Sequence, residues 1–241
     1  GEIYGFIGHN GAGKTTTLKS VVGILQFDQG EIYIDGKSIK EDPLGCKRET
    51  AYIPDNPDLY EYMTGIQYLN FIADIFGVDA DERLKDIRKY ADRFELTQDL
   101  AQPIGAYSHG MKQKLAIIAA WLHHPRLIIM DEPTSSLTED ECKTLFRIVE
   151  RLKRDGITFI FISHKMDEIY TVADEMTVLR DGMTIDCKPV NEMPMQELIS
   201  KMVGREISTF FPPRDSQCGE KLLEVRGLTK AGKFQDISFS V

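Results

Sequence analysis

The sequence lacks any long apolar run, and this absence argues against a membrane-spanning helix. No window approaches the roughly 18 consecutive apolar residues that are typical of such a helix. The longest candidate, residues 115–130, is interrupted by two histidines, a proline and an arginine at 123–126. We therefore expect a chain that does not itself cross a membrane.

Basic residues and closely spaced cysteines are also scarce. The 29 Lys and Arg are outnumbered by 38 Asp and Glu, which gives a net charge of −9. This balance argues against the broad basic surface that nonspecific nucleic-acid binding requires, so no nucleic-acid partner is expected. The cysteines form no CxxC pair, which favours free thiols over a zinc site or a disulfide framework. They are Cys46, Cys142, Cys187 and Cys218.

The first residues lack the pattern of a signal peptide. Gly1 to Tyr4 form neither its charged nor its apolar region, and no initiator methionine is present. We therefore expect the chain to begin inside a longer reading frame. Its 241 residues, 42% of them hydrophobic, suffice for one α/β domain, or for one domain plus a fragment, with a substantial core.

Stretches typical of strands alternate with stretches typical of helices, which predicts an α/β fold with a mainly parallel sheet. The predicted strands are 3–7, 31–35, 50–53, 127–130 and 158–162, and the predicted helices are 14–25, 108–122 and 138–155. Between residues 64 and 95, apolar residues recur every three or four positions. We therefore expect a helical insertion, about 59–122, between two strands of the sheet.

Short local patterns mark the ends of several elements. Asp35-Gly36 is a hairpin-turn signal, because both positions of such a turn need a positive φ. Thr138 followed by Glu141 is typical of a capping box. Ser108 is a natural N-cap for the helix that follows it.

The C-terminal part of the chain differs in character from the rest. A Phe-Phe-Pro-Pro sequence indicates a linker over residues 205–220. Two further strands, 221–226 and 234–241, are predicted after it. An isolated two-stranded hairpin is marginal in water, so we expect this tail to dock on the sheet around residues 1–7 and 31–35.

A glycine-rich segment carries the most specific chemical signal. Gly8-His9-Asn10-Gly11-Ala12-Gly13-Lys14-Thr15-Thr16 fits the pattern G-x-x-x-x-G-K-[ST] of a phosphate-binding loop, between a predicted strand and a predicted helix. The glycines let successive N–H groups face the phosphates, and the helix N-terminus adds positive potential. Lys14 supplies a charge for the β- and γ-phosphates, and the Thr15 hydroxyl is placed for Mg²⁺. The predicted nucleotide-binding residues here are Gly8, Asn10, Gly11, Gly13, Lys14, Thr15 and Thr16.

A second signal is the apolar run 127–130, which leads directly into Asp131 and Glu132. A buried parallel strand that ends in acids delivers them to the rim of the sheet, where ligands bind. Alone, this pattern is equally typical of a strand that simply ends at the solvent. Together with a phosphate-binding loop it predicts that Asp131 holds Mg²⁺ and that Glu132 deprotonates the attacking water.

Two further segments are ambiguous when taken alone. Ser108 to Gln113 reads as an ordinary capped helix start, although a free helix N-terminus can also receive a phosphate. His164 ends a predicted strand, where a lone histidine is more often structural than catalytic. Only the order of all four segments along the chain favours the functional interpretation.

That order resembles the ATP-binding-cassette ATPases, over residues 1 to about 204. The resemblance implies a P-loop cassette with a mainly parallel core sheet, an antiparallel β subdomain and a helical subdomain. It also implies ATP and Mg²⁺ as ligands and a dimer of cassettes, homo- or hetero-, that forms with ATP. In such a dimer Ser108 and Gly110 would contact the nucleotide of the other cassette, and His164 would contact the γ-phosphate.

The chain also departs from the family pattern. The family signature L-S-G-G-Q is here Tyr107-Ser108-His109-Gly110-Met111, which keeps the serine and one glycine. Asp55 occupies the position at which most relatives carry a glutamine that senses Mg²⁺, so we predict Asp55 as a third metal contact. The strands that precede the phosphate-binding loop in the family, and the aromatic residue that stacks on adenine, are missing before Gly1.

The resemblance is divided between two subfamilies. Residues 1 to about 134 resemble cassettes of multidrug or export type. Residues 135–241 resemble the first cassette of tandem sugar importers of ribose or galactose type, and 221–241 resembles the opening strands of their second cassette. A chimera or misassembled fragment joined at Thr134/Ser135 is therefore one hypothesis.

From this resemblance we expect an ATP-hydrolysing subunit that powers a transmembrane permease, at the cytoplasmic face of the cell membrane. Two alternatives remain open: a soluble cassette ATPase switch that is not coupled to transport, and a chimeric fragment that only binds nucleotide. The sequence does not decide between import and export.

Overall fold

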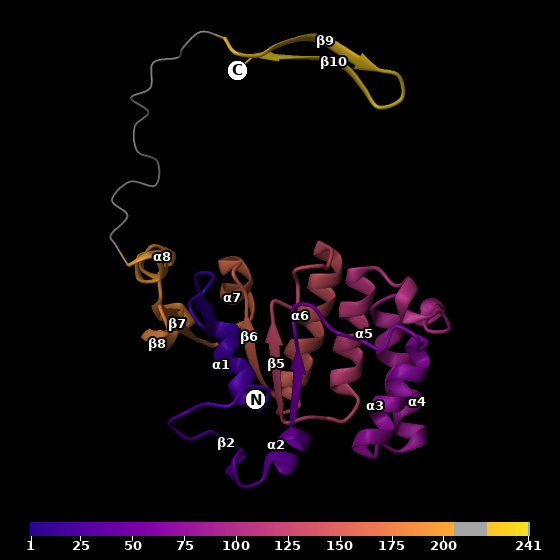
Figure 1. The fold of residues 1–241 in the computed structure, drawn as a ribbon, viewed down its shortest axis with the longest axis vertical. Coiled ribbons are helices and arrows are strands. Elements are labelled where there is room, and N and C mark those ends of the chain that lie inside the picture. Colours follow the sequence, from indigo (N-terminus) through magenta and orange to yellow (C-terminus); the bar gives the residue numbers. More distant parts are fainter. Residues whose placement is uncertain (205–220, 241) are drawn as a thin grey trace. The chain divides into compact units, whose positions relative to one another are not determined.

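The computed structural model describes residues 1–204 and 221–240 (Figure 1). The chain divides into two compact units, residues 1–205 and 206–241, which are described separately. The predicted linker, 205–220, and Val241 lie outside the described residues. Within the part that is described, no helix is both long enough and apolar enough to cross a membrane.

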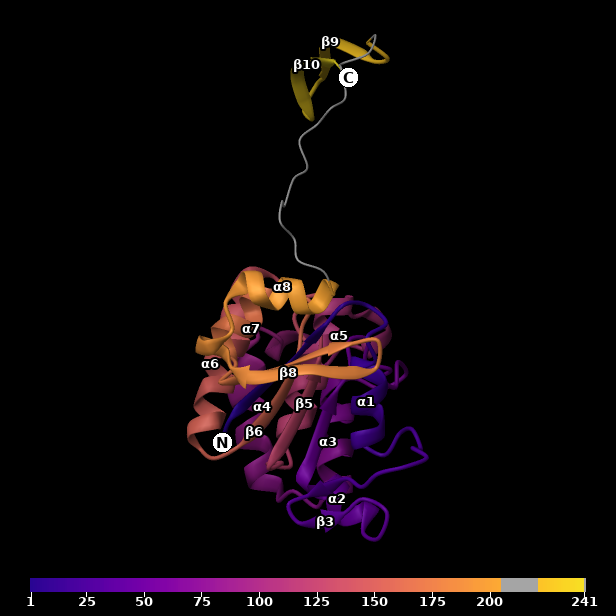
Figure 2. The same ribbon diagram turned by 90° about the vertical axis from the view of Figure 1, so that its left-hand side faces the viewer.

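A six-stranded sheet forms the centre of the first unit, in the order β4-β5-β6-β1-β7-β8. Neighbouring strands pair in parallel except for β8, which is antiparallel to β7. Figure 2 shows β8 at one edge of this sheet. The predicted α/β fold with a mainly parallel sheet is confirmed. The strands are β1 (Ile3–Gly8), β4 (Thr50–Ile53), β5 (Leu127–Asp131), β6 (Thr158–Ile162), β7 (Glu175–Arg180) and β8 (Met183–Pro189).

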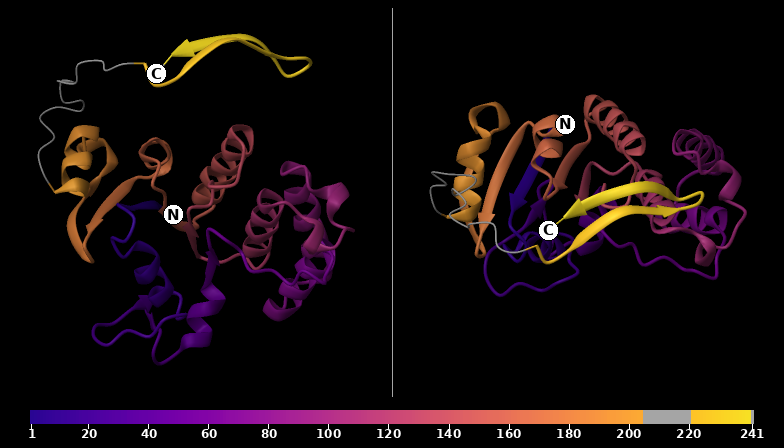
Figure 3. Two further views of the ribbon diagram at one scale, coloured as in Figure 1. Left: turned by 45° about the horizontal axis from the view of Figure 1, so that its top comes forward. Right: turned by 90° about the horizontal axis from the view of Figure 1, so that it is seen from above.

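Successive side chains along each strand point to opposite faces of the sheet, and both faces are apolar. Ile3, Phe159 and Phe161 point to one face, where they pack with α6 (Glu139–Arg154) and α7 (Met166–Val172). Ile129 and Ile162 point to the other face and pack on Leu18 of α1 (Lys14–Val21). The helices on the two faces can be followed in Figure 3. Because helices cover both faces, the central strands read as nearly continuous apolar runs.

The predicted helical insertion lies between β4 and β5. It contains α3 (Gly65–Phe76), α4 (Ala80–Arg93) and α5 (His109–Trp121), with two short 3-10 turns at Thr97–Asp99 and Ile104–Ala106. The helical pattern predicted over 64–95 is interrupted at Gly77, whose φ of 70° closes α3. In Figure 1 these helices gather at the β4 side of the sheet.

Several predicted boundaries need correction. The helix predicted over 14–25 ends at Val21, because Gly23 adopts a φ of 71° and the N–H of Ile24 donates to the carbonyl of Lys19, as in a Schellman motif. The strand predicted over 31–35 shrinks to β2 (Tyr33–Ile34), which pairs with β3 (Lys37–Ser38). The antiparallel β subdomain therefore consists, within the described residues, of this small hairpin. Helix α2 (Pro43–Glu49), whose N-cap is Asp42, was not predicted.

Other local predictions are confirmed. Asp35 and Gly36 both have positive φ and form the predicted hairpin turn. Thr138 and Glu141 form the predicted capping box at the start of α6. At the other end of the first unit, α8 (Met195–Val203) closes on Gly204. The described cysteines, 46, 142 and 187, are free, and residue 218 lies outside the described part.

The second unit is an antiparallel hairpin of β9 (Glu224–Lys230) and β10 (Phe234–Ser240). Two strands were predicted here, but the first begins and ends later than the predicted 221–226. The docking of this hairpin on the first unit stays a prediction.

Candidate nucleotide-binding site

The predicted phosphate-binding loop connects β1 to α1, and its glycines have physical reasons to be glycines. A Cβ at Gly8 would lie 2.3 Å from the carbonyl oxygen of Leu179 on β7. Gly11 and Gly13 have φ values of 85° and 98°, which L side chains rarely adopt. The loop can therefore curl tightly and lead directly into the first turn of α1.

The loop and the end of β5 face one common cavity of about 240 Å³. This geometry joins two segments that are more than one hundred residues apart in sequence. The lining residues are Asn10, Gly11, Gly13, Lys14, Thr15, Thr16, Asp131 and Glu132. Eight of the predicted site residues are thus brought together, six from the loop and the two carboxylates.

The side chain of Lys14 folds back over the phosphate-binding loop. Its Nζ donates to the carbonyl oxygens of Gly8, at 2.8 Å, and His9, at 3.1 Å. Burial lowers the pKa of Lys14, while the charges of Glu132 and Asp131 act in the opposite direction. The positive charge of Lys14 therefore lies between two backbone carbonyl groups and the carboxylates of Asp131 and Glu132.

Thr15 and Asp131 form the oxygen-rich part of the cavity. The Thr15 hydroxyl donates to Oδ1 of Asp131 at 3.2 Å, and the Tyr52 hydroxyl donates to Oδ2 at 3.4 Å. Burial, and next to it the charge of Asp131, raise the pKa of Tyr52. A hydroxyl beside a buried carboxylate is the donor set that Mg²⁺ prefers, so these residues fit that ion. Tyr52 was not predicted from the sequence, because a tyrosine within a strand carries no motif.

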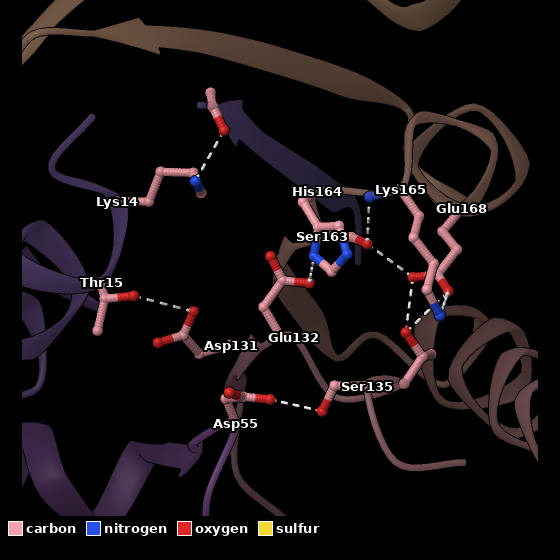
Figure 4. Close-up of polar contacts among 12 residues, drawn as sticks. Lys14, Thr15, Asp55, Asp131, Glu132, Ser135, Ser163, His164, Lys165 and Glu168 are labelled. Atoms are coloured by element: carbon pink, nitrogen blue, oxygen red, sulfur yellow. Dashed lines mark hydrogen bonds and ion pairs between the residues drawn. The ribbon is translucent and has the colours of Figure 1, made fainter. Parts of the chain in front are cut away.

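Glu132 combines an unusual backbone conformation with a partly buried side chain. Its φ is 50°, and its N–H donates to the carbonyl of Ile162 at 3.0 Å. Nδ1 of His164 lies 2.8 Å from its Oε2 (Figure 4). Burial raises the pKa of Glu132, whereas hydrogen bonds from His164 and the charge of Lys14 act to lower it. His164 does not line the cavity itself but contacts a residue that does.

The largely buried carboxylate of Glu168 connects the loop after Glu132 to α7. Glu168 accepts hydrogen bonds from the hydroxyls of Thr134 and Ser163, each at 2.8 Å, and pairs with the ammonium of Lys165 at 3.1 Å (Figure 4). Thr134 and Ser163 are almost fully buried. None of these residues was assigned a role from the sequence. The available signal was a pair of small polar residues after two apolar strands, with an acid in the next helical turn.

Three predicted site residues lie elsewhere. Asp55 accepts a hydrogen bond from the Ser135 hydroxyl and does not line the cavity. Ser108 caps α5 by accepting from the N–H of Met111 at 3.2 Å. Gly110 packs so closely on the next loop that a Cβ would lie 2.7 Å from the carbonyl oxygen of Ser136.

The sequence profile of the family described as ABC transporter matches residues 1–135, which is more than half of the chain. The chain belongs to the ABC transporter family. It contains an ATPase domain of that family, as the resemblance implied. The fold agrees with this assignment. A solved structure described as "ATP binding subunit of ABC transporter" is 29% identical in sequence to this chain and has a TM-score of 0.77. The match covers 85% of this chain and 83% of the chain in that structure.

Curated ABC relatives align with the whole chain. It is 36% identical to "Ribose import ATP-binding protein RbsA" of Bacillus licheniformis and 35% identical to "Galactose/methyl galactoside import ATP-binding protein MglA" of Yersinia pestis. The chain spans about half the length of these relatives, 50% and 49%. Both alignments cover 100% of this chain and so continue across Thr134/Ser135. The predicted division between two subfamilies at this point stays a hypothesis.

Proposed function

We propose that this chain binds and hydrolyses ATP and thereby powers a membrane transporter. The observation that carries the proposal is the single cavity shared by the phosphate-binding loop and the Asp131-Glu132 pair. Backbone N–H groups of the loop and the start of α1 would hold the phosphates, and Lys14 would neutralise the β- and γ-phosphate charge. Phosphoryl transfer needs mainly positioning and charge stabilisation, which this arrangement can provide.

Mg²⁺ belongs to the same proposal. The Thr15 hydroxyl and the Asp131 carboxylate would hold it, since they meet at 3.2 Å inside the cavity. When bound, the ion would neutralise developing negative charge on the phosphates. The predicted metal role of Asp55 is left out, because its carboxylate accepts from Ser135 and is not among the groups that line the cavity.

Glu132 is the proposed general base. Its carboxylate lines the cavity next to Asp131, and burial raises its pKa, which makes the carboxylate a stronger base. His164 orients this carboxylate through the 2.8 Å contact and would reach the γ-phosphate from the same side. Lys14, Glu132 and His164 are thus the proposed catalytic group.

We further propose that two cassettes assemble around ATP. Ser108 and Gly110 do not line the cavity of their own chain, so they would contact a nucleotide only on another cassette. Ser108 stands at the start of a 13-residue helix, where N–H groups can receive a phosphate. The partner cassette can be a second copy or a related chain.

The transporter partner is proposed to be a transmembrane permease for a sugar, with the cassette at the cytoplasmic face of the membrane. The support is that relatives aligned with the whole chain are named as ribose and galactose import proteins. A contact surface is available between the core and the helical insertion, where a cavity of about 290 Å³ is lined by Pro57, Tyr68 and Phe76 among others. Tyr60 and Tyr62, close by in sequence, are exposed aromatic side chains that a partner could cover.

The experiment that tests this function is phosphate release from ATP by the purified chain. We expect release that requires Mg²⁺ and is lost in Lys14→Ala. Reconstitution with a sugar permease should then couple release to sugar uptake. ATPase activity without any coupling in such a system would favour the uncoupled switch, and nucleotide binding without release would favour a fragment that only binds.

A further inference from the structure

The turn that follows Glu132 is held in a strained conformation. Glu132 has a φ of 50°, which side chains other than glycine, asparagine and aspartate rarely adopt. The N–H of Ser135 closes the turn by donating to the carbonyl of Glu132 at 3.1 Å. A conformation of this kind persists only where the surrounding contacts determine it.

Besides the contact of His164 with the Glu132 side chain, three hydrogen-bonding contacts connect the turn to neighbouring elements. The N–H of Glu132 donates to Ile162 on β6, and the Thr134 hydroxyl donates to Glu168 on α7. Both of these partners belong to the central sheet or to a helix that packs on it. The third contact is different, because the Ser135 hydroxyl donates to Asp55, on the segment between β4 and the helical insertion (Figure 4).

The Asp55 segment is itself fixed to the helical insertion. Nε2 of Gln113, a fully buried residue on α5, donates to the carbonyl oxygen of Pro54 at 3.2 Å. Asp55 directly follows Pro54. The Pro54-Asp55 segment therefore links α5 to the turn that carries Glu132: α5 bonds to the carbonyl of Pro54, and the turn bonds to the side chain of Asp55.

We propose that Asp55 is a positioning residue that holds Glu132 in place through Ser135. This inference rests on the proposed role of Glu132 as the base and adds a residue that acts on it without touching the nucleotide. It also explains why a carboxylate suits this position: its oxygen accepts the hydrogen bond from Ser135. A shift of the helical insertion would then reach the turn through this bond.

The test compares Asp55→Ala, Ser135→Ala and the double variant. Each single variant should lower kcat for ATP hydrolysis by about 5- to 10-fold, which corresponds to the roughly 1 kcal/mol of a typical hydrogen bond, with an unchanged KM for ATP. Because both remove the same bond, the double variant should be no slower than either single one. Asp55→Asn keeps an acceptor and should stay within about threefold of the unaltered chain. Asp58→Asn, a nearby exposed carboxylate, serves as the matched control and should change nothing.

A second readout needs neither nucleotide nor activity. The N–H groups of Ser135 and Leu137 donate within the turn, so their hydrogen exchange reports whether it is held. Both should exchange faster in Asp55→Ala and in Ser135→Ala than in the control. If the unaltered chain released no phosphate, the proposed function would fail, and the exchange rates would still decide the role of Asp55.

The opposite pattern would overturn the inference. If Ser135→Ala matched the unaltered chain in kcat and exchange, the bond would have no positioning role. If, in addition, Asp55→Asn raised the Mg²⁺ concentration needed for half-maximal activity, Asp55 would be a metal contact instead. Additive losses in the double variant would likewise contradict a shared bond.

Discussion

Nδ1 of His164 lies 2.8 Å from Oε2 of Glu132, although the two residues follow different strands. The contact forms because β5 and β6 are neighbours in register, with Asp131 opposite Ile162. Each strand is followed within two residues by one member of the pair. This contact connects the proposed base to a group that can adjust its pKa and its orientation.

The His164 contact predicts a shift in the pH dependence of ATP hydrolysis. Glu132 must be ionised to act as a base, and burial raises its pKa while His164 lowers it. His164→Ala removes the side-chain part of that lowering, so the acid limb of the kcat profile should move to higher pH. The exposed His124 supplies the control variant His124→Ala. A profile for His164→Ala that overlays the unaltered one, or moves to lower pH, would contradict the assignment.

Lys14 should determine nucleotide affinity. Lys14→Ala removes the ammonium that the loop holds beside the cavity, and with it a charge-assisted hydrogen bond to a phosphate. We expect ATP affinity to fall by at least about tenfold, measured with a fluorescent ATP analogue. Lys19→Ala, farther along the same helix, is the matched control. Equal affinity in both variants would remove Lys14 from the proposed site.

Glu168 should contribute to stability because two buried hydroxyls depend on it as their acceptor. Glu168→Ala leaves the buried hydroxyls of Thr134 and Ser163 without their acceptor. The free energy of unfolding should fall by about 1–3 kcal/mol, measured by denaturant titration. Glu192→Ala, at an exposed position, should stay within about 0.5 kcal/mol. If both variants unfolded at the same denaturant concentration, the buried network would contribute nothing.

The proposed assembly predicts dimers that depend on ATP. Sedimentation of the slow variant Glu132→Gln with Mg-ATP should show a dimer fraction that is absent without nucleotide. Ser108→Arg, which places a bulky side chain at the start of α5, should prevent this dimer. A Glu132→Gln protein that stays monomeric at high concentration would count against the trans role of Ser108.

Much of the fold could be predicted from local patterns. The strands 50–53 and 158–162 match β4 and β6 residue for residue, because each short apolar run is interrupted at its end, by Pro54 in one case and by Ser163 in the other. Asp35-Gly36 fixed its hairpin turn through backbone preferences that need no tertiary context. The predicted end of α1 was wrong. The apolar residues after Val21 were taken as part of the helix, although Gly23 can adopt the positive φ that ends it.

Site residues could be predicted where they form a contiguous sequence motif. They could not be predicted where their role depends on contacts between distant segments. The loop and the Asp131-Glu132 pair were found because each is read from adjacent residues. Glu168 was missed because its role depends on a hydrogen bond from Thr134, which is 34 positions away in the sequence. Asp55 was noticed only as a departure from a family pattern, and its bond to Ser135 requires two loops to meet in space.

The proposed function depends most on Glu132 as the base. One comparison tests this role directly: phosphate release and ATP binding are measured for Glu132→Gln and for the unaltered chain. The substitution keeps the shape of the side chain and removes its ability to accept a proton. Turnover should fall by about 10²–10⁴, the usual weight of a general base, while ATP affinity stays the same. Turnover within about threefold of the unaltered chain would contradict the central claim.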